Sequence, residues 1–178
     1  MQKLSMDALN RKSVEEFHRS GKHPVIVILE NIRSMHNVGS IFRSADAFLI
    51  DALYLTGYTP CPPHRDIHKT ALGATETVVW KYFNQTAEAI QQLKADGYTV
   101  YAAEQTSESK QVQQFSFTAD AKLAVVFGNE ASGVEEKTLQ LCEGALEIPQ
   151  FGMKHSLNVS VAAGIVMWEC VRKMSLPK

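Results

Sequence analysis

Apolar residues gather in short runs that alternate with stretches of helical periodicity along most of the chain. The first run, Val25–Leu29, is unbroken and mostly β-branched, which is typical of a strand covered on both faces. Together the runs predict strands at residues 25–29, 52–56, 77–82, 98–103, 123–127 and 145–148. The stretches between them predict helices at residues 13–20, 38–48, 86–96, 135–141 and 156–174. This alternation indicates an α/β fold, with a mostly parallel sheet and helices on both faces.

Local signals mark where some of these elements begin and end. Ser13 and Glu16 have the spacing of a capping box at a helix N-terminus. Gly97 follows the helix expected at 86–96, where glycine commonly terminates a helix. The segment Pro60–Lys69 contains Pro60, Pro62 and Pro63, which predicts a long surface loop.

The length of 178 residues fits one domain with a small appendage. We expect residues 1–23 to form a short N-terminal helical extension and residues 24–178 to form the main domain. The net charge is −1, so no overall field attracts nucleic acid and any such contact must use local patches. The basic residues within 1–23 are one candidate patch, although a solvated amphipathic helix explains them equally well.

Cysteine usage and the apolar runs bear on the compartment. Cys61, Cys142 and Cys170 are far apart and odd in number, which argues against a disulfide framework and fits a reducing cytoplasm. Residues 1–22 are largely polar and lack the apolar segment of a signal peptide. The longest apolar run, Val161–Trp168, is far shorter than the roughly 20 residues of a membrane span. We therefore expect a cytoplasmic protein.

Ligands of a parallel sheet bind beyond the carboxyl ends of its strands, and three blocks of the sequence occupy such positions. The first block, Glu30–Asp46, follows the first strand. Asn37 is expected there as the N-cap of the next helix. Arg43 lies further along that helix, where its guanidinium can clamp a phosphate with two hydrogen bonds. An ion pair of Arg43 with Asp46 or Asp51 is the alternative.

The second block, Phe127–Gly133, follows a buried strand. Gly128 lets a ligand approach the backbone, and Gly133 allows a tight turn. Glu130 either caps the following helix or holds a functional group. Alone this pattern is a weak signal, because glycine loops after strands are common.

The third block, Ile148–Gly164, is the most informative part of the chain. It joins a strand end, a loop with Gly152 and a polar helix start, which together make a pocket lined by backbone groups. A simpler interpretation makes Ser156 a helix N-cap and gives Asn158 a local hydrogen bond. That interpretation leaves the length and the glycine of the loop unexplained, so we favour a ligand pocket.

Three motifs in these blocks closely resemble those of the SpoU (TrmH) family. They are Asn37-x5-Arg43, Gly128-Asn-Glu-x-x-Gly133 and Ile148-Pro-x-x-Gly152-x-x-x-Ser-Leu-Asn-Val-Ser160. Family members are RNA ribose 2′-O-methyltransferases of the SPOUT superfamily, and the resemblance spans about residues 24–174. It implies an α/β fold whose C-terminal part forms a deep trefoil knot. It also implies S-adenosylmethionine as cofactor, transfer or ribosomal RNA as substrate, and a homodimer with the active site near the subunit boundary.

The resemblance further assigns roles to individual residues. Those implied to bind the cofactor are Ala103, Gly128, Ile148, Ser156 and Leu157. The catalytic arginine of the family falls on Arg43, and its other functional polar positions fall on Asn37, Glu130, Ser156 and Asn158. Gln150 departs from the family, which usually has Met there, and is expected to adjust the cofactor pocket. Residues 69–76 are expected to start a helix over the active site, where they contact RNA or pack.

The implied reaction moves a methyl group from a sulfonium to a ribose 2′-hydroxyl, so positioning should carry much of the rate. The resemblance implies that Arg43 is the base that takes the proton of this hydroxyl. That role is unfavourable, because a guanidinium has a pKa above about 12 and a nearby phosphate stabilises its charged form. We therefore expect Arg43 to act first as a clamp on the RNA phosphate and the 2′-oxygen.

Three other interpretations stay open on the sequence alone. One is an RNA-binding protein of the same fold that has lost catalysis. A second is an enzyme with another cofactor, although no Gly-x-Gly-x-x-Gly follows the first strand, which weakens a dinucleotide site. A third is a metal site at Cys61-x2-His64-x3-His68, whose spacing suits ligands but which has no fourth ligand nearby.

Overall fold

A single parallel sheet organises the part of the chain that the structure describes. The computed structural model describes residues 3–5, 12–118, 120–154 and 156–175. Within these ranges the sheet has seven strands in the order β3-β2-β1-β6-β4-β7-β5, and all pairs are parallel. The strands are β1 (His23–Glu30), β2 (Ile50–Thr56), β3 (Val79–Phe83), β4 (Thr99–Ala103), β5 (Lys110–Gln111), β6 (Leu123–Phe127) and β7 (Gly144–Glu147). The predicted α/β fold with a mostly parallel sheet is confirmed.

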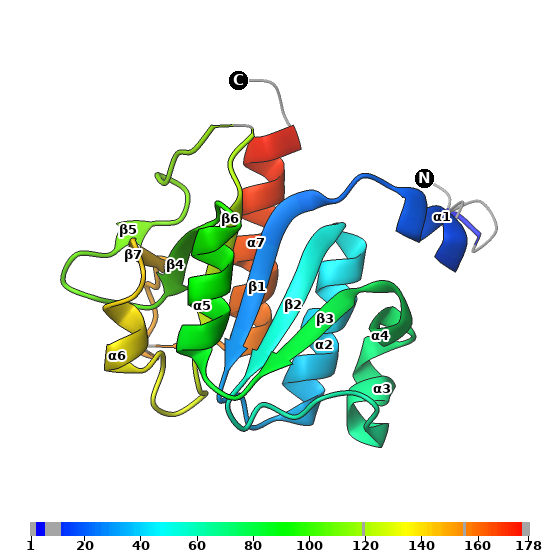
Figure 1. Ribbon diagram of the computed structural model, residues 1–178, viewed down its shortest axis with the longest axis horizontal. Coiled ribbons are helices and arrows are strands. Elements are labelled where there is room, and N and C mark those ends of the chain that lie inside the picture. The colour runs from blue at the N-terminus through cyan, green and yellow to red at the C-terminus, as the bar shows by residue number, and fades with distance from the viewer. Residues whose placement is uncertain (1–2, 6–11, 119, 155, 176–178) are drawn as a thin grey trace.

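Helices cover both faces of this sheet. They are α1 (Val14–Arg19), α2 (Met35–Ala47), α3 (Arg65–Ala71), α4 (Ala74–Thr77), α5 (Thr86–Ala95), α6 (Glu136–Leu139) and α7 (Val159–Ser175). Figure 1 shows α5 in front of the sheet and α2 and α7 behind it. Val25, Val27 and Leu29 of β1 belong to the core with α2 and α7, whereas Ile26 and Ile28 belong to the core with α5. Both faces of β1 are therefore covered, as its unbroken apolar run predicted.

Most of the predicted elements are present, and two errors lie before α2 and α3. The capping box at Ser13 and Glu16 is confirmed in both directions. The prediction of Asn37 as an N-cap is wrong, because α2 begins at Met35 and the Ser34 hydroxyl caps it. The loop predicted over Pro60–Lys69 is wrong in its second half, because α3 begins at Arg65 and the His64 side chain accepts from the Asp66 amide.

Two further differences from the prediction concern boundaries, and a third concerns a strand that was not predicted. The last helix begins at Val159 rather than Ser156, because Asn158 Oδ1 accepts from the Ser160 amide and so caps the first turn. The third strand begins at Val79, because the short helix α4 uses the residues before it. Strand β5 was not predicted, since two residues give no periodic signal.

The packing of α2 against α3 fixes the helix that carries Asn37 and Arg43. A Cβ atom on Gly39 would lie 2.1 Å from Thr70 Oγ1 and 2.3 Å from the Ile67 carbonyl oxygen. Only glycine therefore allows the two helices to approach this closely. The Thr70 hydroxyl also donates to the His36 carbonyl, so α3 holds the first turn of α2 in place.

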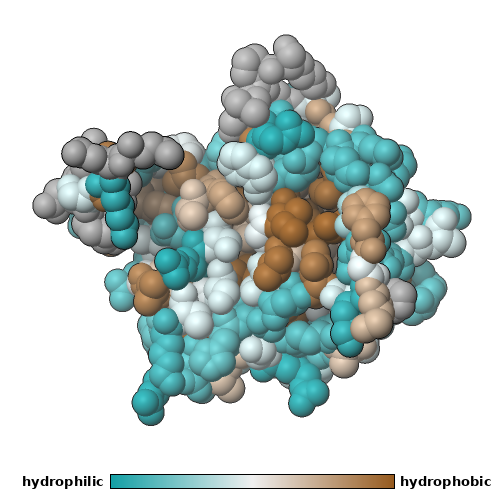
Figure 2. Space-filling model, turned by 180° about the vertical axis from the view of Figure 1, so that it is seen from behind, coloured by the Kyte–Doolittle hydropathy of each residue, from teal (hydrophilic) through white to brown (hydrophobic). Residues whose placement is uncertain are grey.

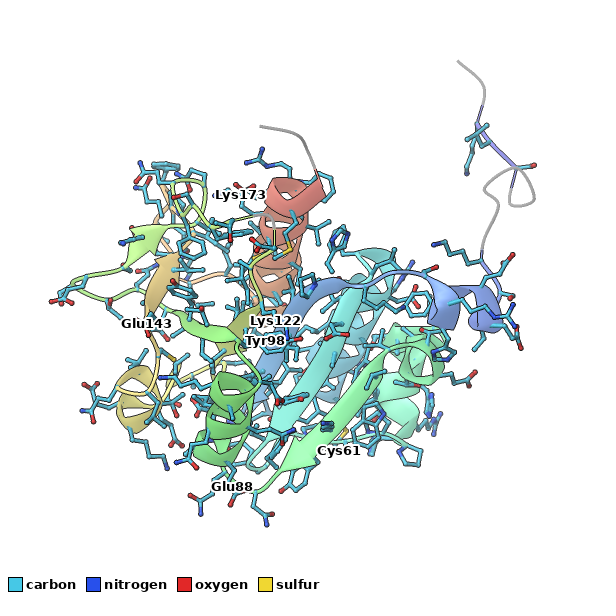
Figure 3. The ribbon with its side chains drawn as sticks, turned by 45° about the horizontal axis from the view of Figure 1, so that its top comes forward. Cys61, Glu88, Tyr98, Lys122, Glu143 and Lys173 are labelled. Atoms are coloured by element: carbon cyan, nitrogen blue, oxygen red, sulfur yellow. The ribbon has the colours of Figure 1, made fainter. Side chains whose placement is uncertain are left out.

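Strand β7 lies between β4 and β5, which follow each other along the chain. The end of the chain thus enters the sheet within the connection that runs from β4 to β6. Lys173 fastens this connection to α7, because its ammonium donates to the backbone carbonyls of Val112, Gln113 and Phe115. Figure 3 shows Lys173 on the last part of α7.

Candidate active site

A cavity of about 650 Å³ opens at the carboxyl ends of β4, β6 and β7. Its size lies within the range of about 300–1,000 Å³ that is usual for small-molecule sites. The five residues expected to bind the cofactor all line it, namely Ala103, Gly128, Ile148, Ser156 and Leu157. Glu130, Gln150 and Asn158 line it as well, so the second and third sequence blocks meet in one place.

The wall of the cavity is acidic. Glu104, Glu130 and Glu147 line it, and no lysine, arginine or histidine of the described chain does so. The Glu104 carboxylate accepts from the amides of Gln105 and Val134 at 3.0 Å each. Glu147 accepts from the Ser109 hydroxyl at 2.8 Å. Such a wall favours a cationic ligand and disfavours a dinucleotide, whose phosphates carry negative charge.

The loop after β6 folds back on itself at one side of the cavity. A Cβ atom on Gly128 would lie 2.1 Å from the carbonyl carbon of Gly133, so the space next to Gly128 is taken by the loop's own backbone. A side chain at this position would clash with that backbone, whereas the glycine itself lines the cavity. Gly133 has φ +69°, in the left-handed region, which bears out the predicted tight turn.

The Glu130 carboxylate holds the loop that precedes α2. One oxygen accepts from the Arg33 amide at 2.9 Å, and the other accepts from the Ser34 amide at 3.0 Å and from Asn37 Nδ2 at 2.9 Å. Partial burial raises the pKa of Glu130, but the hydrogen bonds from Arg33, Asn37 and Ser34 outweigh it and hold the pKa below its usual value. Glu130 is thus an ionised acceptor, suited to positioning rather than proton transfer.

Asn37 and Asn158 extend this arrangement to the start of α7. Asn158 Nδ2 donates to Asn37 Oδ1 at 3.1 Å, while Asn158 Oδ1 accepts from the Ser160 amide at 2.9 Å. Both ends of the Asn37 amide are thereby engaged, one by Glu130 and the other by Asn158. The three side chains link the loops after β1, β6 and β7, which lie far apart in the sequence.

Arg43 and Ser156 are placed differently from this group. Arg43 is exposed on α2, outside the cavity wall. The alternative ion pair is not formed: Asp46 accepts from Thr77, Asp51 accepts from Tyr98, and the salt bridges of the described residues do not include Arg43. Ser156 is exposed and lines the cavity, but it does not cap α7.

Comparison with known proteins decides the family. A sequence model of the SpoU rRNA Methylase family matches residues 24–168, which is most of the chain. The chain belongs to this family. The match contains all three sequence blocks and the first part of α7.

Relatives of known name in the SpoU family share about a third of the residues. A tRNA (guanosine(18)-2′-O)-methyltransferase of Thermus thermophilus is 34% identical over 163 residues, covering 92% of this chain and 82% of that protein. A 23S rRNA (guanosine-2′-O-)-methyltransferase, RlmB, of Vibrio vulnificus is 31% identical over 167 residues, covering 93% of this chain and 66% of that protein.

Solved SpoU-type structures have the same fold. The TrmH/SpoU tRNA modifying enzyme of A. aeolicus superposes with a TM-score of 0.79 at 25% identity, covering 90% of this chain and 80% of that one. An AdoMet-bound rRNA methyltransferase of Sinorhizobium meliloti gives a TM-score of 0.79 at 25% identity, covering 94% of this chain and 62% of that one.

The possible metal ligands of this SpoU protein do not converge. His64 caps α3, His68 Nδ1 lies 3.4 Å from the Thr75 hydroxyl, and the Cys61 thiol lies 3.5 Å from the Thr59 carbonyl. Among the residues that the structure describes, no group of three or more histidine, cysteine or acidic side chains is arranged to hold a metal ion.

Sequence reasoning missed two acidic residues of the SpoU cavity, Glu104 and Glu147. Glu104 directly follows β4, and Glu147 is the last residue of β7. Their position at the carboxyl ends of parallel strands, where ligands bind, is the signal that identifies both.

Proposed function

We propose that this protein transfers the methyl group of S-adenosylmethionine to the 2′-hydroxyl of a ribose in transfer or ribosomal RNA. The observation that carries the proposal is the hydrogen-bonded chain Glu130–Asn37–Asn158, which joins three loops beside an acidic cavity of cofactor size. The names of the curated relatives support the same chemistry, since they methylate the 2′-oxygen of guanosine in tRNA or 23S rRNA.

The cavity suits the proposed cofactor. S-adenosylmethionine supplies a methyl group on a cationic sulfonium, and the three glutamates of the wall complement that charge. The residues that hold the cofactor are Ala103, Gly128, Ile148, Ser156 and Leu157. Gln150 adds an amide to the wall where the family usually has a thioether, so it can offer a hydrogen bond that relatives lack.

Arg43 clamps the RNA in this proposal. Its guanidinium is exposed and free of ion pairs with described residues, so its donors can engage a phosphate and the 2′-oxygen together. Ser156 and Asn158 orient the ribose hydroxyl or the loop that carries them. Glu130 and Asn37 are positioning residues, because their polar groups hold the loop before α2 and the Asn158 side chain.

We also propose that the protein is a homodimer joined through what we call the α7 face. This face consists of Leu157, Val161, Ile165 and Trp168, which are 40%, 50%, 38% and 51% exposed. The last three recur at helical spacing on α7, and Leu157 lies just before the helix. The Trp168 ring lies 5.7 Å from the ring of Phe48, at the end of α2. Figure 2 shows apolar residues gathered on the side of the molecule formed by α2 and α7.

Contiguous exposed apolar surface of this kind marks an interface, and a self-complementary patch gives a twofold dimer. Arg43 lies on α2, beside the α7 face, so a partner chain seated there would place the active site near the subunit boundary. Ile165→Asp should then produce monomers in light scattering, whereas Val79→Asp, on the exposed edge strand β3, should not. A wild-type monomer at micromolar concentration would contradict the dimer.

The trefoil knot and the cytoplasmic location complete the proposal. The insertion of β7 between β4 and β5 supports threading of the last part of the chain through the β4–β6 connection. The cysteines Cys61, Cys142 and Cys170 are all free, which suits a reducing compartment. Within the described residues, none of the helices combines the length and the hydropathy that a bilayer crossing requires.

Substitution of Arg43 tests the function directly. Arg43→Ala should lower methyl transfer about 100-fold or more while leaving the S-adenosylmethionine affinity within about twofold. Arg43→Lys keeps the charge but loses the planar fork, so it should rescue little. The substrate is total RNA from cells lacking the protein, in which the target hydroxyl is unmethylated. Arg65→Ala removes an exposed arginine from α3 and should retain kcat.

Two results would count against this assignment. Loss of cofactor binding by folded Arg43→Ala would make Arg43 a pocket residue. Cofactor binding by the wild type without transfer to any RNA would favour the inactive RNA-binding protein instead. Mapping of 2′-O-methyl sites in the same RNA would identify the nucleotide.

A further inference from the structure

Tyr58 is a large aromatic residue held at the edge of the active site with its ring open to solvent. It is 61% exposed and belongs to neither core cluster of the described residues. It follows Gly57, which leaves β2 with φ +63°. The residues that bind the cofactor do not include it, and it lies outside the cavity wall.

The position of Tyr58 is nevertheless fixed by hydrogen bonds at both ends. Its hydroxyl accepts from Asn129 Nδ2 at 2.9 Å, and its amide donates to Asn31 Oδ1 at 3.2 Å. The Tyr82 hydroxyl donates to the Gly57 carbonyl at 2.9 Å and braces the turn from β3. A Cβ atom on Gly57 would lie 2.0 Å from Asn31 Oδ1, so the turn is also tightly packed.

Asn129 connects Tyr58 to the site. It is only 7% exposed, lines the cavity and precedes Glu130 in the chain. Its side-chain oxygen accepts from the amides of Ala131 and Ser132, so the amide group that meets Tyr58 is itself held. The phenol therefore touches the outer side of the loop whose inner side bounds the cavity.

This arrangement presents the ring of Tyr58 to a partner. Because Asn129 holds the hydroxyl oxygen, Tyr58 offers an aromatic surface that is already ordered, and a partner would lose little entropy in using it. Proteins that read unpaired RNA stack its bases on tyrosine, phenylalanine or tryptophan. The exposed side chain of Arg33, whose amide is bound by Glu130, adds a cation for the backbone phosphate nearby.

We propose that Tyr58 is a stacking platform for an unpaired nucleobase of the RNA, close to the nucleotide that is methylated. The proposal rests on the function proposed above and adds a specificity-determining contact outside the catalytic group. It also implies that the substrate presents its target in a loop or single strand rather than in a continuous duplex.

Three substitutions at Tyr58 separate the ring from the hydrogen bond. Tyr58→Leu removes the ring and should raise the KM for RNA about tenfold, with kcat and cofactor affinity nearly unchanged. Tyr58→Phe keeps the ring but loses the bond to Asn129, and Tyr58→Trp keeps a stacking surface, so both should stay within about threefold of wild type. Melting temperatures check that all variants fold.

Cross-linking identifies the contact independently of catalysis. The probe is 4-thiouridine-labelled total RNA from cells lacking the protein, irradiated with the wild-type protein and analysed by mass spectrometry. A nucleotide adduct on the peptide that contains Tyr58, lost in Tyr58→Leu, is the expected result. Equal damage from Tyr58→Phe and Tyr58→Leu would overturn the proposal, because the hydrogen bond rather than the ring would then matter.

Unchanged RNA affinity in Tyr58→Leu, or adducts only elsewhere, would also overturn it while methyl transfer by the wild type still stood. Absence of any RNA binding or methylation by the wild type would instead refute the proposed function, and the platform with it.

Discussion

Replacing Asn37 with alanine should slow methyl transfer by up to about 30-fold while leaving cofactor affinity nearly unchanged. Asn37 is the middle member of the chain Glu130–Asn37–Asn158, and it lies outside the cavity wall. Its loss removes two hydrogen bonds and frees both the loop before α2 and the Asn158 side chain. The perturbation thus acts on positioning rather than on the reacting groups.

The magnitude follows from the two bonds. A neutral hydrogen bond contributes about 0.5–1.5 kcal/mol and one to a carboxylate about 1.5–3 kcal/mol. Because Glu130 and Asn158 are exposed, water replaces part of the loss, and the lower values apply. Their sum is about 2 kcal/mol, which corresponds to about 30-fold in rate. Alanine favours the helix by up to about 0.7 kcal/mol, so the melting temperature should fall by only a few degrees.

The assay is a double-mutant cycle. Asn37→Ala, Asn158→Ala and the double variant are compared for kcat with tritiated S-adenosylmethionine, and the cofactor Kd is measured by calorimetry. A direct contact predicts a coupling energy of about 0.5–1.5 kcal/mol, so the double variant should lose less than the two single losses combined. Asn84→Ala, which removes an exposed amide after β3, serves as the matched control.

Additive losses would refute this reasoning, because Asn37 and Asn158 would then act through separate contacts. A cofactor Kd that rises as much as kcat falls would refute it as well, since the network would then support the cavity rather than the reacting hydroxyl.

The remaining predictions concern charge, pH and the C-terminal helix. Glu104→Gln should lower the affinity for S-adenosylmethionine about fivefold in calorimetry, because the positive sulfonium loses the attraction of the carboxylate. The affinity for S-adenosylhomocysteine, whose sulfur is uncharged, should not change. An equal loss of affinity for both compounds would refute the prediction. The folded-state pKa of Glu130 lies below its ordinary value of 4.5. The contribution of ionised Glu130 to stability is therefore fully present above pH 4.5 and is lost as the pH falls through the folded-state pKa. The difference in free energy of unfolding between wild type and Glu130→Gln should thus be constant at neutral pH and shrink below about pH 4.5. A gap that widens as the pH falls below about 4.5 would contradict this sign. Lys173→Met removes the hydrogen bonds to the Val112 and Gln113 carbonyls. It should lower the melting temperature by about 3–6 °C and speed amide hydrogen exchange in the β4–β6 connection. Unchanged exchange there would show that other contacts hold the connection.

The sequence predicted the sheet better than its connections. Continuous apolar runs such as Val25–Leu29 identified the strands, because burial on both faces leaves an unambiguous pattern. Helix α3 was not predicted within the segment Pro60–Lys69. The prolines of that segment favour a loop, and the buried face of α3 is too short to give a clear periodic signal. The N-cap of α2 was predicted at Asn37 but lies at Ser34. Both residue types are common N-caps, so the local sequence does not distinguish the two positions.

The site was predictable as a set of residues but not as a set of contacts. The glycine and polar positions of the third block predicted a pocket, and the resemblance to the SpoU family predicted which residues line it. That Asn37 bridges Glu130 and Asn158 depends on how the loops after β1, β6 and β7 converge, which no local pattern encodes. The support of Tyr58 by Asn129 is equally non-local, because the two residues lie 71 positions apart in the sequence.

The position of β7 has a consequence for protein synthesis. Ile148, Ser156, Leu157 and Asn158 leave the ribosome after β1 to β6, yet they form one side of the cavity. A nascent chain can thus assemble most of its sheet but cannot complete the cofactor site until its last strand has entered between β4 and β5. Such long-range pairing folds slowly. A chain interrupted before β7 would therefore be unable to methylate, so incomplete translation products would not modify the RNAs around them.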